Sequence, residues 1–120
     1  MTPAVRNLFT APLPDGEGEV LRTLLENSAF RLESIASRGK RSPEGFWYDQ
    51  AASEWVMLLR GEACLAFEDD ESMNLRAGDY LLIPPHRRHR VEDTSSDALW
   101  LALHFTGNDL KSDNPLEGVQ

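Results

Sequence analysis

The chain has 120 residues, of which 41% are hydrophobic and 27% charged, as expected for a single globular domain. Its 20 Asp and Glu against 12 Lys and Arg give a formal net charge of −8, which disfavours a nucleic-acid partner because phosphate is repelled. No run approaches the roughly 18 apolar residues of a membrane span, no signal peptide is recognisable, and the single cysteine excludes an intrachain disulfide. A cytoplasmic protein without a membrane partner is therefore expected.

Residues 1–29 are expected to form an N-terminal arm and the first strand of the same domain. Residues 1–16 contain three prolines and little periodicity, which predicts an extended arm and not a helix. Residues 19–26 carry leucines at helical spacing, but the segment is short and has no clear cap. Because the neighbouring segments resemble strands, a strand is favoured for 19–26.

In residues 30–105, turn residues separate short apolar segments at regular intervals, as in an all-β domain. Residues 106–120 are predicted to form a polar C-terminal tail. A loop at 38–45, an acidic turn at 68–72 and a turn at 77–79 separate short apolar segments. About eight strands at such close spacing are typical of a jelly-roll sandwich or barrel. Beyond 19–26, the predicted strands are 30–37, 45–49, 54–59, 62–68, 73–75, 80–84, 89–93 and 98–105.

Two of these strands are apolar on both faces. Along 54–59, Val56 and Leu58 share a face with Glu54, while Trp55 and Met57 lie on the other. The segment 98–105 behaves in the same way. Since a solvated outer face of an antiparallel sheet would be polar, we expect the arm, a second subunit, or both to cover it. A homodimer is the resulting prediction.

Residues 78–93 resemble the second motif of the cupin family. That motif has a glycine, five residues, a proline, one residue, a second glycine, two residues, a histidine, three residues and an asparagine. Here Gly78, Pro84 and His89 follow its spacing. His86 stands in place of the second glycine, and Asp93 stands in place of the asparagine.

The first cupin motif is only half present. Its glutamate matches Glu54, which a glycine follows after six residues. Its two histidine positions hold Tyr48 and Gln50 at the three-residue spacing, or Trp47 and Asp49 at the four-residue spacing. Together with the strings PEGFWYDQ, EWV and PPHRRHRVE, the chain resembles a poorly characterised subgroup of small single-domain bacterial cupins.

The resemblance implies a cupin double-stranded β-helix over residues 30–105 and a metal inside the barrel. The implied ligands for a divalent ion such as Mn, Fe, Ni or Zn are Gln50, Glu54 and His89, with Tyr48 as a fourth ligand or a catalytic acid or base. One imidazole, one carboxylate and one amide oxygen make a harder and weaker site than three histidines.

Two other arrangements remain open for these residues. If His86 or His104 joined His89 and Glu54, the set would match the facial triad of non-haem iron oxygenases. Whether His104 points inward depends on the register of the last strand. Alternatively, an arginine pairs with Glu54 and His89 is only a hydrogen-bonded pocket residue.

The arginines at 87, 88 and 90 form either a solvated rim or a hook for an anion. The second interpretation predicts a small anionic metabolite as partner, with His86, Arg88, Arg90 and His104 as substrate-binding residues. Function then divides between a metal-dependent oxygenase or isomerase and a metal-free binding or sensing module. A dimeric interaction protein with a vestigial pocket is the third hypothesis.

Overall fold

The computed structural model describes residues 2–10, 18–107 and 110–113, and these residues form eight strands. None of the described residues belongs to a helix that is long and apolar enough to cross a membrane. The strands are β1 (Val20–Glu26), β2 (Phe30–Ala36), β3 (Ser53–Arg60), β4 (Glu62–Phe67), β5 (Met73–Arg76), β6 (Tyr80–Ile83), β7 (His89–Thr94) and β8 (Leu99–Phe105).

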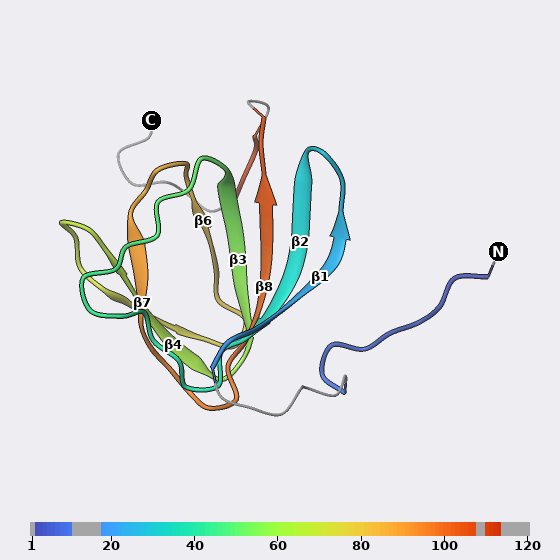
Figure 1. The fold of residues 1–120 in the computed structure, drawn as a ribbon, viewed down its shortest axis with the longest axis horizontal. Coiled ribbons are helices and arrows are strands. Elements are labelled where there is room, and N and C mark those ends of the chain that lie inside the picture. The colour runs from blue at the N-terminus through green and yellow to red at the C-terminus, as the bar shows by residue number, and fades with distance from the viewer. Residues whose placement is uncertain (1, 11–17, 108–109, 114–120) are drawn as a thin grey trace.

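The strands form two antiparallel sheets that face each other (Figure 1). The larger sheet has the order β1-β2-β8-β3-β6, and the smaller has the order β5-β4-β7. Strands far apart in sequence are therefore neighbours, as in a jelly roll. The predicted all-β jelly-roll class is confirmed, and so is the strand favoured for 19–26, which is β1.

The strand predicted at 45–49 is wrong. Only Tyr48 pairs there, through a single bridge to His89 on the free edge of β7. Further back, the Ser42 N–H donates to the carbonyl oxygen of Val91 at 2.8 Å. Between these contacts Gly45 has a φ of +78°, and a turn joins Pro43 to Phe46. The segment thus touches the edge of β7 at separate points without forming a ladder.

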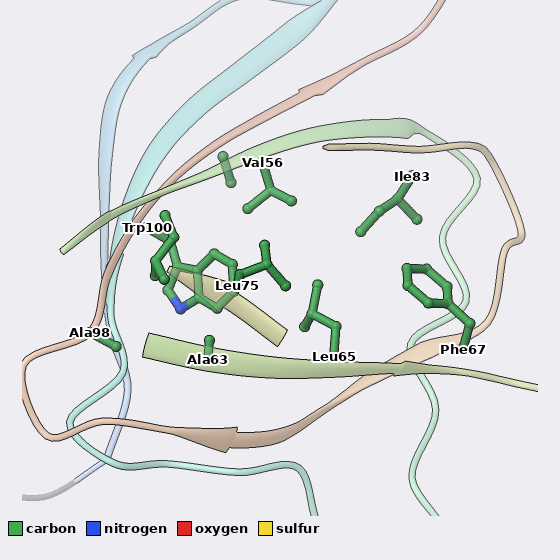
Figure 2. Packing of buried hydrophobic residues seen from close by; sticks show 10 residues of the cluster. Val56, Ala63, Leu65, Phe67, Leu75, Ile83, Ala98 and Trp100 are labelled. Carbon is green, nitrogen blue, oxygen red and sulfur yellow. The ribbon is translucent and has the colours of Figure 1, made fainter. Parts of the chain in front are cut away.

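The core lies between the sheets and is apolar at one end of the barrel (Figure 2). Val56, Leu58 and Trp100 from the larger sheet meet Leu65 and Leu75 from the smaller one. The indole N–H of Trp100 donates to the buried Ser37 hydroxyl at 2.9 Å. Trp100 is thereby fixed and presents its ring carbons to the interior.

The outer face of the larger sheet is apolar and partly exposed. It carries Trp55, Met57, Leu101 and Leu103, and the edge strand β1 adds Leu25, which is 60% exposed. The Phe9 ring lies 5.8 Å from the Arg60 guanidinium at the end of β3, and the chain N-terminal to it extends away from the barrel (Figure 1). Residues 1 and 11–16 of the arm, and 108–109 and 114–120 of the predicted tail, lie outside the described residues. The homodimer stays a prediction.

Substitution of Gly61 tests how tightly the turn between β3 and β4 is packed. Gly61 and Gly45 both have positive φ values, +86° and +78°, so alanine is strained at either position. A Cβ on Gly61 would collide with Ser95 and lie 2.8 Å from Asp97 Oδ1, whereas a Cβ on Gly45 meets nothing within 4 Å. We expect Gly61→Ala to lower the free energy of unfolding by about 2–4 kcal/mol and Gly45→Ala by about 1–2 kcal/mol. Urea denaturation measures both, and equal losses would contradict the packing argument.

Candidate functional site

A cavity of about 360 Å³ lies between the two sheets and receives residues from both. This volume is at the lower end of the range for small-molecule pockets, roughly 300–1,000 Å³. Its apolar wall consists of Ile35, Val56, Leu65, Ile83, Val91 and Trp100. Its polar lining consists of Glu19, Arg31, Glu33, Tyr48, Gln50, Glu54, His89 and His104, and Leu21 completes it.

Strand register brings part of the polar lining into one row across the larger sheet. Arg31 on β2 pairs with His104 on β8, and His104 pairs with Glu54 on β3. In the neighbouring row, Glu33 pairs with Ala102, which is fully buried and small. The larger sheet therefore presents two carboxylates, one imidazole and one guanidinium to the same end of the cavity.

Glu33 is fully engaged by its neighbours. The His104 Nε2–H donates to Glu33 Oε1 at 2.8 Å, and the Arg31 Nε lies 3.3 Å from Glu33 Oε2. A buried carboxylate is costly unless it is paired and hydrogen-bonded, and Glu33 has a partner at each oxygen. The register question about His104 is also answered, because this side chain lines the cavity.

His89 enters the cavity from the smaller sheet in a fixed orientation. Its Nδ1–H donates to the carbonyl oxygen of Arg87 at 2.8 Å, and the Tyr48 ring stacks on it at a centroid distance of 5.5 Å. In the neutral imidazole, Nε2 is then a hydrogen-bond acceptor. This Nε2 lies 3.6 Å from Glu54 Oε1, so two acceptors face each other unless a proton or a ligand donor lies between them.

Glu54 differs from Glu33 because no group in the described part of the chain donates a hydrogen bond to it. The residue is 8% exposed. Its oxygens lie 3.6 Å from His89 Nε2 and 3.7 Å from His104 Nε2, both beyond good hydrogen-bonding distance. Since Glu54 lines the cavity, its missing donor or cation can come from a ligand.

Three of the predicted substrate-binding residues do not line this cavity. The side chain of His86 is 69% exposed, and its Nδ1–H donates to Asp49. Arg88 forms an ion pair with Glu68, and the Arg90 guanidinium lies over the Trp47 ring. The remaining predicted residues, Tyr48, Gln50, Glu54, His89 and His104, do line the cavity, and their individual roles stay predictions.

Sequence reasoning missed Glu19, Arg31 and Glu33 as pocket residues. Arg31 and Glu33 are two positions apart in a mostly apolar strand, which places both on one face. Two charged residues on the same strand face as the apolar Ile35 were the signal that could have placed them in a pocket. For Glu19, which precedes β1, the sequence holds no comparable signal.

The donor set around Glu54 would suit a hard divalent cation held weakly. Within residues 2–10, 18–107 and 110–113, no group of three or more His, Cys, Asp or Glu side chains is arranged to hold a metal ion. The predicted ligand set adds the Gln50 amide to Glu54 and His89, all three of which line the cavity. The Nδ1 hydrogen bond of His89 is the type of contact that orients a metal-binding imidazole.

Comparison with known families agrees with this architecture. The family model described as "Cupin domain" matches residues 38–104, more than half of the chain. The chain belongs to the cupin family. The cupin resemblance stated from the two motifs is thereby confirmed, although no match was found among curated proteins.

Solved structures give the same fold. A protein from Ralstonia eutropha JMP134, called a "putative mannose-6-phosphate isomerase", is 39% identical, with a TM-score of 0.82 over 88% of this chain and 100% of its own. An RmlC-like cupin from Desulfovibrio desulfuricans is 20% identical, with a TM-score of 0.69 over 87% of this chain and 97% of its own. KdgF from Halomonas sp. is 18% identical, with a TM-score of 0.67 over 85% and 94%. The last two support the fold alone.

The carboxylates that line this cupin's cavity influence the pKa of Glu19. Burial raises the pKa of Glu19 above its ordinary 4.5; the negative charges of Glu33 and Glu54 raise it further, and Lys40 opposes them. Because the pKa is higher in the folded chain, the folded state holds the Glu19 proton more tightly. The free energy of unfolding therefore falls as pH rises from 4.5 through the folded-state pKa.

Glu19→Gln imitates the protonated carboxyl, so we expect it to raise the free energy of unfolding at pH 7 and to have a smaller effect at pH 4. Urea denaturation at the two pH values measures the difference. Glu62→Gln, which changes an exposed carboxylate outside this cavity, is the matched control. A stabilisation by Glu19→Gln that is the same at both pH values would contradict the argument.

Proposed function

We propose that this cupin binds a small metabolite in its barrel cavity and moves a proton on it, as an isomerase does. The observation that supports this most directly is Glu54, a buried carboxylate that faces the cavity without a hydrogen-bond donor from the described residues. A carboxylate that faces a cavity and has no close donor can meet a bound substrate and act on it as a general base. His89 and His104 stand on either side of it.

In the proposed reaction, Glu54 takes a proton from the carbon next to a substrate carbonyl. On a substrate whose neighbouring carbon bears a hydroxyl, the electron pair of the broken C–H bond forms a carbon–carbon double bond. The π pair of the carbonyl moves to its oxygen, which gives an enediolate. The Tyr48 hydroxyl or the Gln50 amide, which both line the cavity, donates a hydrogen bond to that oxygen. Glu54 then returns its proton to the former carbonyl carbon, while the proton of the neighbouring hydroxyl passes to the former carbonyl oxygen. One C–H and one O–H bond break and one of each forms, so no oxidant is needed.

The name of the Ralstonia eutropha protein supports this class of reaction, since it denotes an isomerase and the protein is 39% identical. We extend to this chain only the class of reaction. The arginine run that led us to expect an anionic metabolite lies outside the cavity lining, so Arg31 is the described arginine that could meet such a ligand there.

A metal remains part of the proposal as an optional component. Glu54, His89 and Gln50 would hold it, and when bound it would polarise the substrate carbonyl as a Lewis acid. An oxygenase reaction would need more, because His104 would have to leave Glu33 to join Glu54 and His89 as a facial triad. Because His104 is hydrogen-bonded to Glu33 and not free to join a facial triad, isomerisation is favoured over oxygenation.

Elemental analysis tests the metal component. Protein purified without chelator or nickel affinity, then dialysed against Mn²⁺, is expected to retain manganese weakly, in an amount that falls on further dialysis. His89→Ala should lose this manganese, whereas His86→Ala should retain it because His86 lies outside the cavity lining. Equal manganese in wild type and His89→Ala would contradict the ligand assignment.

Deuterium exchange tests the reaction class. Sugars with and without phosphate, including mannose 6-phosphate, are incubated in D₂O, and ¹H NMR follows the proton on the carbon next to the carbonyl. We expect wild type to exchange this proton on at least one sugar. Glu54→Gln should lower the exchange rate at least about a hundredfold, in line with the loss of a general base. Glu62→Gln should leave it unchanged. No exchange with any sugar would contradict the proposed isomerisation.

The second candidate is a metal-free binding or sensing module. It is favoured by the lack of a preformed group of three metal-binding His, Cys, Asp or Glu side chains in the described ranges. The same cavity and the same Glu54 would then bind a ligand without converting it. Saturable binding without deuterium exchange would support this candidate over the enzyme.

A further inference from the structure

The cavity carries more negative than permanent positive charge. Three carboxylates of the described residues line it, those of Glu19, Glu33 and Glu54, against the single guanidinium of Arg31. Arg31 is itself 3.3 Å from Glu33. The positive charge of the 87–90 run is directed elsewhere, to carboxylates outside this lining such as Asp70, Glu68 and Glu92.

The excess negative charge is located at Glu54 and Glu19, and Lys40 opposes the charge of Glu19. Glu33 already has His104 at one oxygen and Arg31 at the other. Among the described residues, the nearest ionisable partners of the Glu54 oxygens are imidazole nitrogens at 3.6 and 3.7 Å. A buried carboxylate without a close partner is unfavourable, and a ligand that brings a cation to it recovers that free energy.

The acceptors around Glu54 also have the spacing that a single ammonium group can bridge. His89 Nε2 is an acceptor when the ring is neutral, because Nδ1–H is bonded to the Arg87 carbonyl. An ammonium group has three N–H donors and could donate both to His89 Nε2 and to Glu54 Oε1, which are 3.6 Å apart. A carboxylate or phosphate at this point would face Glu54 and be repelled.

The rest of the cavity selects for an apolar ligand body. Val56, Leu65, Ile83 and Trp100 line it, and the indole N–H of Trp100 is already bonded to Ser37. Figure 2 shows these four side chains in the space between the sheets. A ligand that fits both parts has an apolar body and a cationic head.

We propose that the cavity binds a small organic cation whose ammonium group contacts Glu54 and whose apolar part packs against Val56, Ile83 and Trp100. This inference rests on the proposed small-molecule pocket and names the class of its ligand. It runs against the anionic metabolite expected from the arginine run, and the two can be separated by charge-matched probes.

The probes are sets of the same carbon skeleton with different head groups. One set is phenethylamine, 2-phenylethanol and 3-phenylpropanoate; the other is isopentylamine, isopentyl alcohol and 4-methylpentanoate. Binding is measured by calorimetry and by the melting temperature, with EDTA present. Mannose 6-phosphate serves as the phosphate probe and Mn²⁺, without EDTA, as the metal probe. We expect at least one amine to bind at least about tenfold more tightly than its alcohol and its carboxylate.

Matched variants locate the contact. Glu54→Gln should remove the preference for the amine, and Glu62→Gln, which removes the same charge outside the cavity, should preserve it. If Glu54→Gln does not fold, the comparison of head groups in the wild type still shows whether the cavity prefers a cation.

Several results would overturn the inference: tighter binding of a carboxylate or of mannose 6-phosphate, equal binding of amine and alcohol, no saturable binding of either amine, or a response to Mn²⁺ alone. Because these measurements record binding without turnover, they are independent of the exchange experiment. Amine binding without sugar exchange would support the ligand class and reject the isomerase. Sugar exchange without amine binding would do the reverse.

Discussion

The antiparallel register between β3 and β8 determines how the barrel interior is divided. Leu58 pairs with Trp100, Val56 with Ala102 and Glu54 with His104, so the pairs change from apolar to ionisable along the same two strands. A shift of β3 by one residue against β8 would move Glu54, Val56 and Leu58 to the opposite face of the sheet. The buried pairs at the apolar end favour the observed register, and this register in turn holds Glu54 and His104 together in the cavity.

Strand alternation explains why the side chains of Arg88 and Arg90 point away from the cavity. His89 faces inward, so its neighbours on either side point away from the cavity. Arg90 accordingly lies over Trp47, and Arg88 pairs with Glu68. Arg87 donates to the Glu68 carbonyl oxygen and lies over the Phe67 ring. Arg87 and Arg88 thus fasten the end of β4 to the turn before β7, and Arg90 contacts the segment 42–47 through Ser42 and Trp47.

Most of the fold could be predicted from sequence because alternation and turn residues report local structure. The residues Glu54 and His89 could be named because the sequence around them resembles the two cupin motifs. Glu33 could not be assigned to the site, since its importance depends on the pairing of β2 with β8, which sits far away in the sequence. The segment 45–49 has strand-like aromatic residues but lacks continuous pairing, because Gly45 and the Pro43–Phe46 turn bend it away from β7. Tertiary pairing, which propensity does not contain, decided both cases.

Whether the protein is an enzyme or a binding module, its ligand would meet the same residue of the cavity, Glu54. Within the described residues, Glu33 is held by His104 and Arg31, and Glu54 is left for whatever enters. If the ligand carries an acidic C–H bond against Glu54, the contact is a proton-transfer step. If it carries only an ammonium N–H, the contact is recognition and the proton stays where it was. The fold does not choose between these outcomes. The chemistry of the ligand atom that reaches Glu54 does, which makes the identity of that atom the deciding fact about function.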